Sequence, residues 1–85
     1  MNKSHLEELL DAIKTESERG SHDLQVFLEG ILTPSELEQM VKRLQIVKQL
    51  KKGRPQRDIA ADLEVGIATV TRGAREIANG KFENV

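Results

Sequence analysis

The residues best suited to chemistry lie between 55 and 80, where two helical patterns follow each other closely. Ile59 and Leu63 give the first an apolar face, and Val70 marks the buried face of the second. Residues 64–66 are short enough to form a tight turn between them. This spacing is typical of a helix-turn-helix, in which a short helix supports a second one whose first residues enter the DNA major groove.

Side chains around this turn are of the types that contact duplex DNA. Ile67 and Ala68 suit thymine methyl groups, Thr71 suits phosphates or base edges, and Arg57 can bind guanine or phosphate. The predicted DNA-binding residues are Arg57, Gly66, Ile67, Ala68, Thr69, Thr71 and Arg72. The alternative is an ordinary helical hairpin with solvated arginines.

Charge is distributed unevenly along the 85 residues. Residues 1–40 hold three basic and nine acidic residues, a net charge of −6, whereas residues 41–85 hold ten basic and five acidic residues, a net charge of +5. A basic half of this kind favours a polyanionic partner such as double-stranded DNA. A solvated helix surface would have a similar composition.

Helical periodicity extends through the whole sequence, and no alternating strand pattern is present, so we expect an all-α fold. Ser4 and Glu7 have the spacing of a capping box for a first helix, which Gly20 would end. Ser21 is then expected to cap a short second helix with an interruption near Gly30.

The third helix has the clearest predicted start. Thr33 and Glu36 have the spacing of a capping box, and Pro34 occupies the first helical position, where its missing N–H costs nothing. The apolar stripe continues to about Lys52, and Gly53 would end the helix. With the two helices of the 55–80 segment, five helices are expected.

Several classes of protein are disfavoured. The chain has no cysteine and no long apolar run, so we expect a cytoplasmic protein without a membrane partner. His5 and His22 lack a third ligand at a recognisable spacing, so no metal site is predicted. Ser21 and Asp23 flank His22 in sequence, whereas catalytic triads converge from distant positions, so no catalytic residues are predicted and the chain is not expected to be an enzyme.

Four segments, residues 32–34, 43–47, 56–58 and 66–73, closely resemble the Trp repressor family in type and order. The resemblance implies a five-helix, all-α fold with a C-terminal helix-turn-helix. It also implies an intertwined homodimer that represses transcription from a palindromic operator.

Under this resemblance the chain is a single domain, 1–85, with two roles. Residues 1–52 would form the helical dimerisation core, and residues 55–80 would form the DNA-binding head. The acidic N-terminal half would then build the dimer instead of contacting DNA.

The resemblance further implies a corepressor, L-tryptophan, bound between the core and each head. Arg43 and Arg72 would hold the indole between their guanidinium planes, with Arg72 also placed to bind the carboxylate. Gly73 would let the ring approach closely. The implied ligand-binding residues are Leu32, Thr33, Arg43, Arg72, Gly73 and Glu76.

Two residues depart from the family pattern. Glu64 stands where a glycine is usual in the turn, and Glu76 stands where a serine helps to hold the amino acid. Glu76 is four residues after Arg72 and can form an ion pair with it. A different ligand, or none, is therefore the alternative to L-tryptophan, and a helical protein–protein interaction module is the alternative to a repressor.

Overall fold

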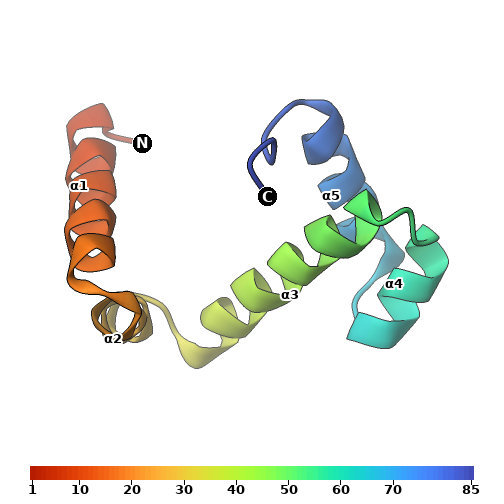
Figure 1. Cartoon of the computed structure of the whole chain (residues 1–85), viewed down its shortest axis with the longest axis horizontal. Coiled ribbons are helices and arrows are strands. Elements are labelled where there is room, and N and C mark those ends of the chain that lie inside the picture. Colours follow the sequence, from red (N-terminus) through yellow and green to blue (C-terminus); the bar gives the residue numbers. More distant parts are fainter. The chain divides into compact units, whose positions relative to one another are not determined.

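Five α-helices and no strands make up the chain in a computed structural model that describes all residues, 1–85 (Figure 1). The helices are α1 (Lys3–Arg19), α2 (Ser21–Ile31), α3 (Pro34–Lys51), α4 (Gln56–Leu63) and α5 (Ile67–Ala78). The predicted all-α fold with five helices is confirmed. None of the five combines the length and the apolarity needed to span a bilayer.

Contacts within the chain define two compact units, an N-terminal unit, Met1–Leu37, and a C-terminal unit, Glu38–Val85. The functional division after residue 52, between a dimerisation core and a head, depends on a second chain and stays a prediction.

Helix α1 begins earlier than the sequence suggested. The Asn2 side chain caps it, because its Oδ1 accepts a hydrogen bond from the backbone N–H of His5 at 3.1 Å. The predicted capping box of Ser4 and Glu7 is therefore wrong, and Ser4 lies inside the first turn. Asparagine and serine cap helices about equally well, so the cap nearer the N-terminus gives the longer helix.

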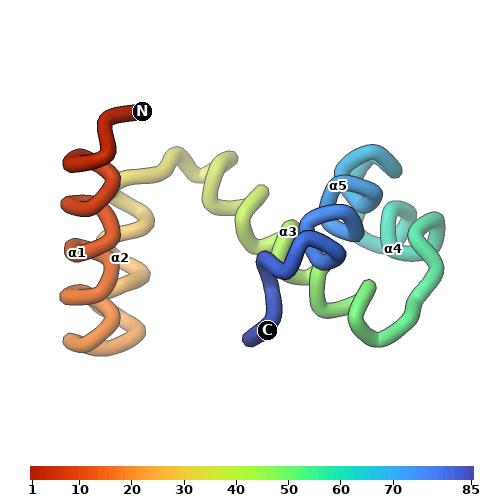
Figure 2. Tube along the Cα trace, turned by 90° about the horizontal axis from the view of Figure 1, so that it is seen from above, coloured from red at the N-terminus to blue at the C-terminus, as the bar shows by residue number.

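Gly20 both ends α1 and caps α2. Its φ of 131° lies in the region that favours glycine, and this one residue reverses the chain so that α2 turns back alongside α1 (Figure 2). Ser21 is consequently the first residue of α2 and not its cap, contrary to prediction. The helix also continues through Gly30 without the expected interruption.

Helix α3 begins as predicted. The Thr33 N–H donates to Glu36 Oε1 at 2.8 Å, and the Glu36 N–H donates to Thr33 Oγ1 at 3.2 Å, which is a complete capping box. The backbone N–H and then the side chain of Thr33 hold the pKa of the Glu36 carboxyl below its usual range. Pro34 is the first helical residue, and Gly53, with a φ of 82°, follows the C-terminal end.

The core of the C-terminal unit forms where α4 and α5 pack on the second half of α3. Ile46, Ile59 and Val70 are fully buried there, one from each helix. Four partly buried apolar side chains pack against these three, namely Leu50, Ala60, Leu63 and Val65, the last of them from the turn. This small core fixes the position of α5.

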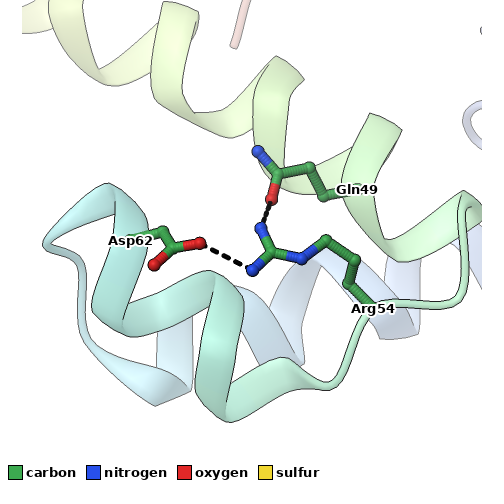
Figure 3. A network of polar contacts seen from close by, with 3 residues as sticks. All are labelled: Gln49, Arg54 and Asp62. Carbon is green, nitrogen blue, oxygen red and sulfur yellow. Dashed lines mark hydrogen bonds and ion pairs between the residues drawn. The ribbon is translucent and has the colours of Figure 1, made fainter.

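Arg54 connects α3 to α4 (Figure 3). Its guanidinium donates to Gln49 Oε1, and a second nitrogen lies 2.6 Å from Asp62 Oδ2. Both charged side chains are substantially exposed, so this pair contributes little to stability, about 0–1 kcal/mol. Its main effect is to orient α4 against the end of α3.

Candidate nucleic-acid interface and ligand cavity

The turn between α4 and α5 is built around a left-handed residue. Glu64 has φ 55° and ψ 48°, and it is the only non-glycine residue of the chain with positive φ. The next residue, Val65, donates its N–H to Ala60 O at 3.1 Å and closes the turn. Glutamate in this conformation costs about 1 kcal/mol relative to glycine, the residue that the resemblance led us to expect here.

The first turn of α5 is exposed and has no side-chain cap. Gly66 occupies the N-cap position with a φ of −69°, and no side chain accepts from the helix N-terminus. A side chain at Gly66 would meet nothing within 4 Å, so the fold of the chain does not itself require glycine there. Ile67 and Ala68 are exposed beside it. This end of α5 therefore presents unpaired backbone N–H groups and an open approach.

Thr71 joins the two helices across this surface. Its hydroxyl donates a hydrogen bond to Gln56 Oε1 at 2.9 Å, which links α5 to the first residue of α4. Sequence reasoning had missed Gln56, because the two residues are 15 positions apart and no local spacing signals the contact. Arg57 and Arg72 are exposed, whereas Thr69 is half-buried and turns toward the cavity described next.

A cavity of about 440 Å³ lies within the C-terminal unit. Its apolar walls include Met40, Leu44 and Val47 from α3. Four of the predicted ligand-binding residues line it together, namely Arg43, Arg72, Gly73 and Glu76. Leu32 and Thr33 belong to the N-terminal unit, and their role as ligand contacts stays a prediction.

Three of these residues differ from what the sequence led us to expect. Gly73 lines the cavity, but it also lets α5 lie close to α3, because a Cβ there would be 3.0 Å from Ile46 Cγ2. Arg72 and Glu76 form no ion pair, although their spacing allows one; the chain's three ion pairs lie elsewhere. Arg72 is exposed and Glu76 is half-buried.

Phe82 completes one wall of the cavity and was not predicted. It lies in the turn segment that follows α5, and Lys51 at the end of α3 holds this segment in place. The Lys51 ammonium donates to the backbone oxygen of Phe82 and, at 2.9 Å, to that of Val85. A contact spanning about 30 residues leaves no periodic signal in the sequence.

Comparison with known proteins extends this picture. Residues 4–84 match the Trp repressor protein family. The chain belongs to the Trp repressor family. It is 42% identical over 72 residues to a Trp operon repressor homolog of Vibrio vulnificus strain YJ016, an alignment that covers 84% of this chain and 69% of the relative.

Other relatives agree with this assignment. A Trp operon repressor homolog of Vibrio cholerae is 39% identical over 75 residues, covering 87% of this chain and 71% of its own length. One of Actinobacillus succinogenes is 39% identical over 74 residues, covering 86% and 71%. No solved structure gave a significant match. As a member of the Trp repressor family, the chain is a repressor-type regulator and not an enzyme.

Proposed function

We propose that this repressor binds operator DNA in a sequence-specific manner, with α4 and α5 acting as a helix-turn-helix. The observation that carries the proposal is the exposed, uncapped start of α5 at Gly66. The free N–H groups and the positive end of the helix dipole attract a phosphate. Ile67 and Ala68 are then placed to contact thymine methyl groups, and Arg57 and Arg72 to contact phosphates or guanine.

The proposed repressor acts as a homodimer on a palindromic operator. No residue of α1 or α2 is buried, although both helices carry apolar faces. Leu6, Leu9 and Leu10 on α1 are exposed to between 37% and 55%. A second copy of the chain would cover such a face, and the two heads would read two half-sites related by the same two-fold axis.

The proposed effector is a small aromatic molecule bound in the cavity of the C-terminal unit, with L-tryptophan as the first candidate because the relatives are named Trp operon repressor homologs. The cavity has the volume and apolar walls usual for such ligands. Arg43 and Arg72 supply planar guanidinium groups that can stack on a ring.

DNA binding is tested by titrating the chain with random and with selected duplexes at increasing salt. We expect measurable binding at low salt and a linear fall of log affinity with log salt concentration, because phosphate contacts release counterions. Arg57→Ala should weaken binding, whereas Lys3→Ala, which removes the same charge from the N-terminal unit, should not. Undetectable binding at low salt would contradict the proposal and favour a protein–protein interaction module.

The ligand is tested by calorimetric titration with L-tryptophan. Saturable binding, together with tighter operator binding in its presence, is the expected result. If no heat is observed while DNA binding is intact, L-tryptophan is not the effector.

A further inference from the structure

Glu76 is the one acidic side chain that lines the cavity of the C-terminal unit. It is half-buried, and its carboxylate forms no ion pair with any residue of the chain. Arg75 directly precedes it and Arg72 lies one turn earlier on α5, and both arginines are exposed. Glu76 thus has a free charge beside a space large enough for an aromatic ligand.

Most of the other side chains that line the cavity are either apolar or exposed to solvent. Leu44, Val47 and Phe82 are apolar and offer no hydrogen bonds from their side chains. The two remaining charged groups, Arg43 and Arg72, are exposed to solvent. Solvent screens exposed charges more strongly than partly buried ones, so the Glu76 carboxylate discriminates most sharply between charged ligand groups.

We propose that Glu76 makes this cavity selective for an aromatic amine, whose ammonium group it binds, and that the ligand needs no carboxylate. The inference rests on the proposed effector cavity, but it does not depend on DNA binding. An ammonium donates charge-assisted hydrogen bonds to the Glu76 carboxylate. The ring lies against the apolar walls and the guanidinium planes, while a ligand whose only charged group is a carboxylate is repelled by Glu76.

Three probes that share one ring separate the charge requirements. Tryptamine carries only the amine, indole-3-propionate only the carboxylate, and L-tryptophan both. In calorimetric titrations of the full chain we expect tryptamine to bind roughly tenfold or more tightly than indole-3-propionate, the size of one charge-assisted hydrogen bond.

Glu76→Gln tests the residue directly because it removes the charge and keeps the shape. We expect it to weaken tryptamine binding roughly tenfold or more and to strengthen indole-3-propionate binding. Glu83→Gln is the matched control, since Glu83 is exposed and does not line the cavity. Circular dichroism should show that both variants keep their helical content.

Three outcomes of these titrations would overturn the inference. Equal affinity for tryptamine and indole-3-propionate, no effect of Glu76→Gln in a folded protein, or no binding of any probe would each do so. A chain that binds the probes as expected but fails to bind duplex DNA would instead overturn the proposed function and leave the cavity's selectivity standing.

Discussion

The two units of this short chain differ in how far each buries its own apolar side chains. The C-terminal unit encloses its own core, with one fully buried residue from each of α3, α4 and α5. In the N-terminal unit, α1 and α2 pack on each other and bury no residue, and their apolar faces stay uncovered. A core completed within one chain fixes the geometry of a surface, whereas an uncovered apolar face favours association with a partner.

The largest effect that this contrast predicts is a loss of folding stability when Ile59 is truncated. The side chain is fully buried, so Ile59→Ala should lower the free energy of unfolding by about 2–5 kcal/mol through lost burial and the cavity left behind. Ile67→Ala removes the same atoms from an exposed position of the same unit and should cost less than about 1 kcal/mol. Urea denaturation measures both, and equal losses would contradict the assignment of the core.

A charge placed on the apolar face of the N-terminal unit should weaken dimerisation and leave the fold of the chain unchanged. Leu10 is 55% exposed on α1, and Leu10→Glu would place a charge on the face proposed to meet a second copy. We expect the dimer dissociation constant to rise roughly tenfold or more. Sedimentation equilibrium measures it, with Thr15→Glu, an exposed position on the same helix, as the control. An unchanged dissociation constant would show that this face is not the interface.

A smaller effect is expected at the turn of the C-terminal unit. Glu64→Gly relieves the left-handed conformation and should raise the free energy of unfolding by roughly 1 kcal/mol. Glu64→Ala keeps a β-carbon and should give no such gain. If both variants behave alike in thermal denaturation, the backbone conformation is not the cause.

The smallest effect concerns the capping box at the start of α3. Because the folded-state pKa of Glu36 is depressed, its contribution to stability is present above the unfolded-state pKa and is lost as pH falls through the folded-state value. An NMR titration should find the Glu36 pKa below its usual range. Thr33→Ala should raise it only in part, since the backbone N–H that lowers it most remains. An unshifted value in the unmodified chain would contradict the capping box.

Local signals predicted much of this fold. The cap of α3 is contained within four residues, so it could be predicted from the sequence. The left-handed conformation of Glu64 was signalled only by the resemblance, which puts a glycine at that position. The predicted start of α1 was wrong because Asn2 and Ser4 lie within one turn of each other and both residue types cap helices well.

The cavity was predicted in part. Arg43, Arg72, Gly73 and Glu76 came from the family resemblance, and the structure brings them together. Phe82 was missed because its position depends on Lys51, about 30 residues away. Spacing alone allowed an Arg72–Glu76 ion pair, but spacing does not fix the side-chain conformations, and the structure has no such pair.

Gly73 has a consequence for how the cavity can evolve. It lines the cavity on one side and packs against α3 on the other, so any larger residue there changes the cavity wall and the helix spacing together. Other residues line the cavity without belonging to the buried cluster, among them Arg43, Glu76 and Phe82. Mutations at these three positions can therefore change the shape and charge of the cavity one at a time, whereas a mutation at position 73 also disturbs the helix packing.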